Sequence, residues 1–229
     1  IGTELAVLIY FRKDILRIAL AWMKQISRRT LVGDEKRDAR LGWLILVGTL
    51  PIVILGYLGQ DLIRDNFRSL WLIATVLIVF GVILGIADKY GKTERQLHEL
   101  TPAHGILYGL AQALALVPGV SRSGATIAMG RFLGYSREAA LRYSFLLALP
   151  AVFGSGLYEL KGAISDTSTS QAFSLPETLV ATAIAFIIGY AVIAWILKYV
   201  TTKSFAPFIA YRIGLGSLLL IALSTGMIG

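Results

Sequence analysis

The fold is decided by the stretch LWLIATVLIVFGVILGIA at residues 70–87, which carries no charged side chain. A helix that crosses a bilayer needs about 20 predominantly apolar residues. Further stretches of the same character lie at 43–59, 143–158, 179–197 and 207–223. Since a helix satisfies its own backbone hydrogen bonds where water is absent, the sequence predicts an all-α fold: a polytopic membrane protein forming one integral membrane domain over residues 1–229.

The composition agrees with this class. Of the 229 residues, 56% are hydrophobic and only 16% are charged, against about 25% charged residues in an ordinary soluble domain. Such a composition excludes a disordered chain, which needs low hydrophobicity and high charge, and argues against a soluble globular enzyme. The absence of cysteine excludes disulfides and thiol nucleophiles.

The positive charges are distributed unevenly between the predicted spans. Seventeen of the 22 Lys and Arg residues fall in four polar stretches, 12–42, 88–103, 131–142 and 198–206. Two other stretches, 60–69 and 159–178, hold three. Because cytoplasmic loops of membrane proteins are enriched in Lys and Arg, the first four are expected in the cytoplasm. The net charge of +8 is then a topology signal, and no nucleic-acid partner is expected.

The first residues, 1–11, are apolar but too few to cross a bilayer. We expect the chain to begin inside a truncated span whose upstream segment is missing. Residues 12–42 are then expected to form a cytoplasmic basic loop. Within it, residues 12–29 place four basic side chains on one helical face, which fits either an interfacial helix touching anionic lipid or a solvated extension of the first span.

The assignment of 88–103 and 131–142 to one side predicts that residues 104–134 enter the membrane and return, as a re-entrant helix hairpin. Its first arm covers 104–117, it breaks at Pro118 and Gly119, and the return arm covers about 124–133. The tip is PGVSRSGAT, residues 118–126. Non-helical backbone at this depth is tolerated only in a protein interior or beside a water-filled cavity.

The tip predicts an anion site. A charged Arg122 within the membrane is costly and indicates function, and a guanidinium binds phosphate through two parallel hydrogen bonds. The hydroxyl groups beside it belong to Ser121, Ser123 and Thr126. The alternative is that Arg122 only caps the end of the first arm.

Two glycines and a helix start favour the same site. Gly119 and Gly124 allow the backbone to approach an anion closely. The return helix is expected to begin near Gly124, so that free N–H groups and the positive end of the helix dipole face the tip.

The tip also carries a family resemblance. The strings VPGVSRSGATIAMGRFLGYSREAA (117–140), RYSFLLALPAVFGSGLYEL (142–160), IGTELAVLIYFRKDI (1–15) and FAPFIAYRIG (205–214) resemble the undecaprenyl-diphosphatase family of the bacitracin-resistance type. That resemblance implies six spanning helices and two re-entrant hairpins in two inverted repeats, with the site at their interface. It implies hydrolysis of undecaprenyl diphosphate to the monophosphate and inorganic phosphate, which recycles the lipid carrier for peptidoglycan synthesis in the bacterial plasma membrane.

The resemblance assigns catalytic roles to Ser121, Arg122, Ser123 and Thr126, while the close backbone approach described above assigns substrate binding to Gly119 and Gly124. It also implies a divalent cation, Mg or Ca. The family's glutamate-rich motif and its Ser-Ser-Thr-Gly-His segment are absent from this sequence. We therefore expect most metal ligands, and the base, in the missing upstream segment, so that the chain as given holds half an active site.

Other candidates are weaker. Glu4 is expected mid-membrane, as a site residue or the partner of a buried arginine. Arg212 is expected to snorkel to the cytoplasmic interface, Arg137 to lie at the surface, and His98 and His104 to lie away from the tip.

A rival function comes from transporters, which share re-entrant hairpins and inverted repeats. The chain would then be a translocase of a phosphorylated prenyl lipid or small anion, with Arg122 as the binding residue. The sequence leaves the oligomeric state open, a homodimer included.

Overall fold

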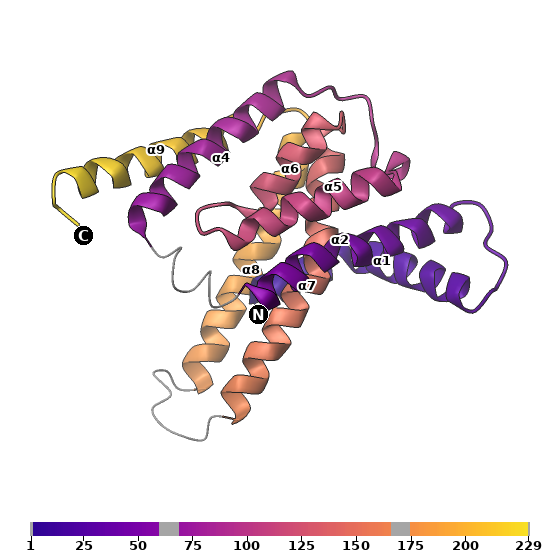
Figure 1. Ribbon diagram of the computed structural model, residues 1–229. Coiled ribbons are helices and arrows are strands. Elements are labelled where there is room, and N and C mark those ends of the chain that lie inside the picture. Colours follow the sequence, from indigo (N-terminus) through magenta and orange to yellow (C-terminus); the bar gives the residue numbers. More distant parts are fainter. Residues whose placement is uncertain (1, 60–68, 166–174, 229) are drawn as a thin grey trace.

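The computed structural model describes residues 2–59, 69–165 and 175–228, with side chains described except at 157–165 and 175. Within these ranges the fold is all-α and contains no strand (Figure 1). The helices are α1 (Gly2–Ile26), α2 (Glu35–Leu58), α4 (Leu70–Tyr90), α5 (Pro102–Ala113), α6 (Arg122–Phe132), α7 (Arg137–Ser165), α8 (Leu175–Val200) and α9 (Ala206–Ser224), with 3-10 turns η1 (Leu97–Glu99) and η2 (Leu114–Leu116). The predicted fold class is confirmed.

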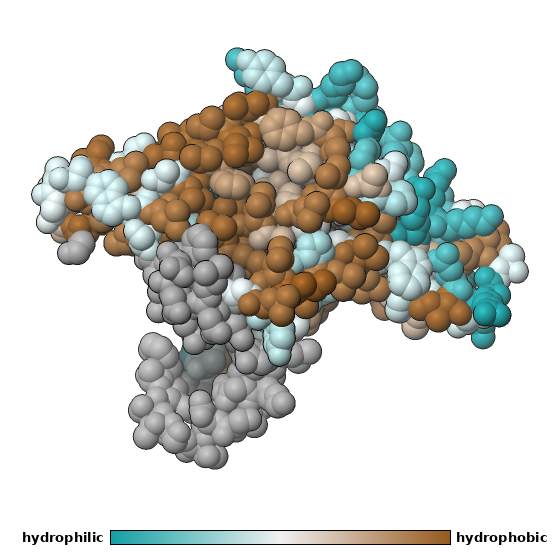
Figure 2. All heavy atoms as spheres, viewed as in Figure 1, coloured by the Kyte–Doolittle hydropathy of each residue, from teal (hydrophilic) through white to brown (hydrophobic). Residues whose placement is uncertain are grey.

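Five of these helices are long and apolar enough to cross a membrane: α2, α4, α7 over Arg137–Gly156, α8 and α9. Each overlaps one of the predicted spans and extends beyond it at one or both ends. Much of their apolar surface is exposed, and Figure 2 shows hydrophobic side chains over most of the visible face. Exposure on this scale is expected of surface that contacts lipid rather than water. The chain is a multi-pass membrane protein.

The polar stretches gather at one end of the molecule, which we call the polar end. Arg142 in α7 pairs with Asp14 in α1 at 2.6 Å, and Nη2 of Arg40 in α2 donates to the carbonyl oxygen of His98 at 3.1 Å. Figure 2 shows the corresponding hydrophilic surface along one edge. Of the two stretches predicted on the opposite side, 60–68 and 166–174 lie outside the described residues, while 159–165 and 175–178 continue α7 and α8.

The prediction of a basic loop over residues 12–42 is wrong. Helix α1 continues without a break to Ile26, α2 begins at Glu35, and only 27–34 connect them. Nε of Arg17 pairs with Asp38 at 3.0 Å, and Lys24 pairs with Glu35. Cross-helix ion pairs of this kind fit a helical hairpin, so the basic stretch extends the first helix. Helix α1 is not among the described helices that are long and apolar enough to cross a membrane, because charged residues follow Phe11.

Helices α5 and α6 form the predicted hairpin. The 12 residues of α5 extend only about 18 Å, too short to cross a bilayer. Both outer ends of the hairpin lie at the polar end, where the Arg95 amide donates to the carbonyl oxygen of Gly134 at 3.0 Å and the Ser136 amide donates to that of Arg95 at 2.9 Å. The α-helical part of the first arm ends at Ala113, earlier than predicted, and a 3-10 turn follows.

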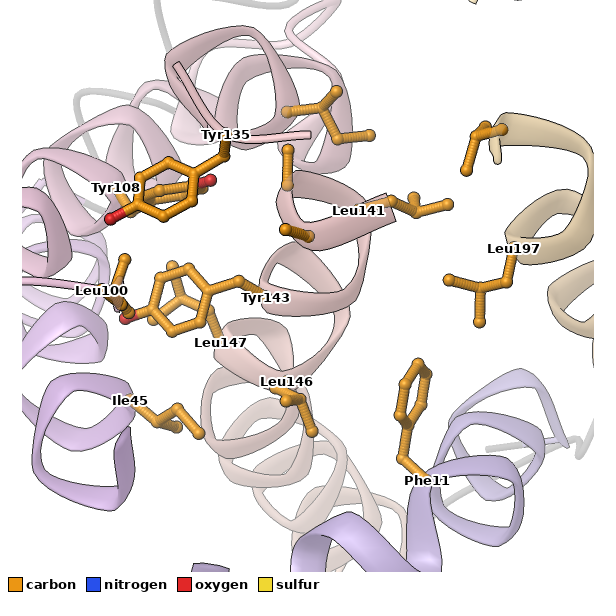
Figure 3. Close-up of a cluster of buried hydrophobic side chains, with 14 of the residues drawn as sticks. Phe11, Ile45, Leu100, Tyr108, Tyr135, Leu141, Tyr143, Leu146, Leu147 and Leu197 are labelled. Carbon is orange, nitrogen blue, oxygen red and sulfur yellow. The ribbon is translucent and has the colours of Figure 1, made fainter. Parts of the chain in front are cut away.

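Close backbone contact holds the hairpin against α2. A methyl group added to Gly109 would lie 2.5 Å from the carbonyl oxygen of Gly48, so that neither helix can carry a larger residue at the crossing. Next to this crossing, Tyr108 and Tyr143 pack edge to face with ring centroids 4.7 Å apart. Figure 3 shows Tyr143 in the core with Tyr135, and the Tyr143 hydroxyl donates to the Leu44 carbonyl oxygen at 3.1 Å.

A buried ionic junction fixes the helices at the polar end. Asp88 of α4 accepts from Nε of Arg137 at 2.6 Å and from the backbone amide of Phe205 at 3.0 Å. The side chain of Arg131 in α6 is 1% exposed and lies 3.5 Å from the same carboxylate. Arg131 also donates to the carbonyl oxygens of Gly91 and Tyr135, both at 2.6 Å. Because a buried charge is tolerated only when paired, this junction ties α4, α6, α7 and the start of α9 together.

Candidate active site at the hairpin tip

The hairpin tip turns at Gly119, which has a φ of +94°. A methyl group at this position would lie 2.7 Å from the carbonyl oxygen of Ile73 in α4. Only glycine combines this backbone conformation with so close an approach. The tip is therefore held against the first turns of α4 by its backbone.

Ser121 begins the return helix. It is the N-cap of α6, and its Oγ accepts a hydrogen bond from the Gly124 amide at 3.2 Å, as serine does at helix starts. The hydroxyl oxygens of Ser121 and Ser123 lie 3.3 Å apart. The helix thus begins at Arg122, two residues before the predicted start, and presents its N-terminal dipole at the tip.

The serines and Gly124 open onto a cavity of about 260 Å³, which we call the serine cavity. Its other walls come from four further helices and the α8–α9 connection, through Leu84, Leu141, Phe145, Ile196, Phe205, Phe208, Tyr211 and Arg212. A polar patch from α6 thus faces a largely apolar chamber. That combination suits a charged headgroup with an apolar tail.

Arg122 faces the other way. It lines a second cavity of about 130 Å³, the arginine cavity, with Thr3 and Glu4 from α1 and apolar side chains of α7. Phe145 borders both cavities. Successive helical residues point about 100° apart, so Arg122 and Ser123 point in different directions from the helix start. Arg122 and the serines, predicted to form one anion site, therefore line two adjoining cavities.

Thr126 is set apart from both cavities. Its side chain is fully buried (0% exposed). Its Oγ1 lies 2.6 Å from Oγ of Ser144 in α7 and within 3.2 Å of the carbonyl oxygens of Arg122 and Ser123. These contacts use its donor and an acceptor position within the α6–α7 interface. The geometry suits Thr126 to holding the start of α6 in place.

Arg212 does not lie where the sequence interpretation placed it. Its Nη2 donates to the carbonyl oxygen of Gly119 at 2.8 Å, and its side chain lines the serine cavity. Its Nε is buried and has no hydrogen-bond partner among the described residues. It therefore points at the tip and does not snorkel. The sequence feature that could have located Arg212 correctly is its position in FAPFIAYRIG, well inside an apolar helix.

The remaining candidates lie at the polar end. Nδ1 of His104 is 2.8 Å from the Tyr135 hydroxyl oxygen, and burial lowers the His104 pKa below its ordinary value, with a smaller contribution from Arg95. His98 is exposed. Neither histidine reaches the hairpin tip, as expected. Arg137, predicted at the surface, is instead partly buried and paired with Asp88.

Metal ligands are few at the tip. No cluster of three His, Asp or Glu side chains that could hold a metal ion occurs within residues 2–59, 69–165 and 175–228. Glu4 supplies the carboxylate among the residues that line the arginine cavity. One carboxylate beside an arginine does not by itself form a site for a divalent cation.

Comparison with known proteins gives one consistent result. The model of the family described as "Bacitracin resistance protein BacA" matches residues 1–218. A curated protein of Pseudarthrobacter chlorophenolicus named undecaprenyl-diphosphatase is 54% identical over 228 residues, covering 100% of this chain and 82% of the relative. A protein of the same name from Micrococcus luteus is 55% identical with the same coverage. Undecaprenyl-diphosphatase 2 of Agrobacterium fabrum is 54% identical, covering 100% of this chain and 80% of the relative.

Proposed function

This chain belongs to the family of bacitracin resistance protein BacA, and from that premise we propose that it is an enzyme that hydrolyses undecaprenyl diphosphate to undecaprenyl phosphate and inorganic phosphate. The relatives named undecaprenyl-diphosphatase, matched over the whole chain, support the substrate. The reaction regenerates a lipid carrier for peptidoglycan synthesis and protects against bacitracin. The protein would act in the bacterial plasma membrane with its polar end in the cytoplasm, as its Lys and Arg distribution favours.

The observation that carries the proposal is a helix start flanked by two arginines at the end of a re-entrant hairpin. Arg122 lies in one cavity and Arg212 in the adjoining one, with Ser121 and Ser123 at the start of α6. Two guanidinium groups and a helix N-terminus favour an anion. The apolar walls of the serine cavity, which include Leu84, Ile196 and Phe208, suit the first units of a prenyl tail.

The reaction needs positioning and charge stabilisation more than covalent chemistry. In phosphoryl transfer, negative charge spreads over the equatorial oxygens of the transferred group, and catalysis lies in holding that group in line with its nucleophile. We assign Arg122 and Arg212 to binding the diphosphate and stabilising that charge. The hydroxyl groups of Ser121 and Ser123 would orient the phosphate oxygens. Gly119 and Gly124 would let the backbone approach the headgroup.

Thr126 has a different role in this proposal. Its hydrogen bonds to Ser144 and to the carbonyl oxygens of the first turn of α6 would keep Arg122 and Ser123 aimed at their cavities. Thr126 is then a positioning residue. A divalent cation, Mg or Ca, stays a prediction, and it would need ligands beyond Glu4.

The test is phosphate release from undecaprenyl diphosphate by detergent-purified protein, with and without chelator. Hydrolysis supports the proposal, and loss of activity with chelator supports the cation. No release with substrate still bound would contradict it and favour a translocase of a phosphorylated prenyl lipid.

A further inference from the structure

Two cavities of the described residues lie at the polar end, away from the hairpin tip. One of them, a groove of about 750 Å³, is lined by Gln25, Leu31, Lys36, Arg37, Arg40, Trp43, Leu44 and Pro102. We call it the basic groove. Its residues come from the end of α1, the α1–α2 connection, the start of α2 and the start of α5. The proposed hydrolysis uses none of them.

The charged side chains that line the basic groove all carry the same sign. Three side chains, those of Lys36, Arg37 and Arg40, are cationic, and no carboxylate side chain is among the lining residues. Arg37 makes an exposed ion pair with Asp34 at 3.0 Å, and such pairs contribute little at a surface. Arg40 donates to a carbonyl oxygen through one nitrogen, which leaves its other donors available. The charged side chains among the groove's lining residues are thus all cations.

Trp43 indicates the level of the groove relative to the membrane. Helix α2 begins with mostly charged residues at 35–40 and is largely apolar from Leu41 onward. Trp43 follows this boundary, is 43% exposed and packs edge to face on Trp22 with centroids 5.5 Å apart. Tryptophan is enriched where a bilayer meets water. The groove therefore spans the level where lipid phosphates lie above acyl chains.

We propose that the basic groove binds the headgroup of an anionic phospholipid. The lipid phosphate would lie between Lys36, Arg37 and Arg40, and the upper acyl chain would pack on Trp43, Leu44 and Leu31. Charge complementarity selects an anionic over a zwitterionic lipid, because basic pockets beside transmembrane helices attract net negative headgroups. The lipid would fasten the α1–α2 turn to the start of the hairpin at Pro102.

Quenching of tryptophan fluorescence by brominated lipids tests this proposal. The full protein is placed in bilayers in which either phosphatidylglycerol or phosphatidylcholine carries bromine near the top of its acyl chain. We expect stronger quenching by brominated phosphatidylglycerol, and we expect Trp43→Phe to remove most of the difference. Equal quenching by the two lipids would overturn the proposal.

A matched pair of variants separates the groove from general surface charge. Lys36→Gln with Arg37→Gln removes two cations from the groove, and Lys92→Gln with Lys203→Gln removes two exposed cations elsewhere at the polar end. Each groove charge should contribute about fivefold to affinity, so the first pair should lose about 25-fold. The second pair should keep the wild-type preference.

Two results would contradict the proposal: a preference that survives the groove variant, or an equal loss in both variants. Lys36→Gln alone, with an expected loss of about fivefold, provides the same comparison if the double variant does not fold. The proposal is independent of the hydrolysis. Activity on undecaprenyl diphosphate in detergent should be the same in the groove variant as in the wild type.

Discussion

The guanidinium of Arg212 in α9 donates a hydrogen bond to the backbone carbonyl oxygen of Gly119 at 2.8 Å, which joins two residues 93 positions apart. This contact fixes the re-entrant tip to the last helix. Because Arg212 also lines the serine cavity, one side chain both positions the turn and supplies positive charge where a diphosphate would lie.

Replacing Arg212 should lower activity. Arg212→Gln should reduce kcat/KM for phosphate release by about 10- to 100-fold, because a hydrogen bond from a charged donor contributes about 1.5–3 kcal/mol. Arg212→Lys should recover only part of the loss, since lysine lacks the planar fork of arginine. The control Arg142→Gln, which removes an arginine paired with Asp14 at the polar end, should be close to wild type. Equal activity of Arg212→Gln and wild type would remove Arg212 from the site.

Replacing Gly119 should disturb the turn. Gly119→Ala places a methyl group 2.7 Å from the Ile73 carbonyl oxygen at a φ of +94°. We expect a loss of about 2 kcal/mol in stability, measured as a lower apparent melting temperature in detergent, and reduced phosphate release. Gly154→Ala is the control, because nothing described lies within 4 Å of its added carbon. A melting temperature for Gly119→Ala at or above that of Gly154→Ala would show that the tip is not held against α4.

Thr126 allows structural and chemical roles to be separated. Thr126→Val keeps the shape but removes the hydrogen bond to Ser144 at 2.6 Å, so it should lower stability by about 1–3 kcal/mol. Thr126→Ser should retain both stability and activity. Thr75→Val is a matched control, because Thr75 makes the same intrahelical bond, to Trp71 at 2.8 Å, on an exposed face. Full stability of Thr126→Val with complete loss of activity would instead indicate a direct catalytic role.

The stability of the polar end should depend on pH. Burial holds the pKa of His104 below its ordinary value of 6.5, so the folded state binds fewer protons there than the unfolded state. The stabilising contribution is therefore present above about pH 6.5 and is lost as the pH falls below it. Melting curves from pH 7.5 down to about 5 should show a smaller decline for His104→Gln than for wild type. The exposed His98→Gln should decline as wild type does, and identical curves for all three would contradict the assignment.

Much of the architecture could be predicted because uninterrupted apolar runs and uneven positive charge are local properties of sequence. They located the five spans and indicated the hairpin. The continuation of α1 to Ile26 was missed, because a charged surface helix and a polar loop look alike until ion pairs such as Arg17 with Asp38 are known.

The sequence singled out the hairpin tip and its glycine turn, but not the geometry of the tip. The different directions of Arg122 and Ser123 depend on where α6 begins, and the direction of Arg212 depends on how α9 packs on α4. The junction of Asp88 with Arg131 and Arg137 was missed for the same reason, since only tertiary contacts distinguish these charges from surface ones.

The central claim is that the start of α6 binds the reacting diphosphate through Arg122, and steady-state phosphate release from undecaprenyl diphosphate tests it most directly. Wild type would be compared with Arg122→Gln, Arg122→Lys and the half-buried control Arg142→Gln, which removes an arginine paired with Asp14 at the polar end. We predict a fall of at least about 100-fold in kcat/KM for Arg122→Gln, partial recovery for Arg122→Lys, and near wild-type kinetics for Arg142→Gln. Wild-type kinetics in Arg122→Gln would contradict the claim.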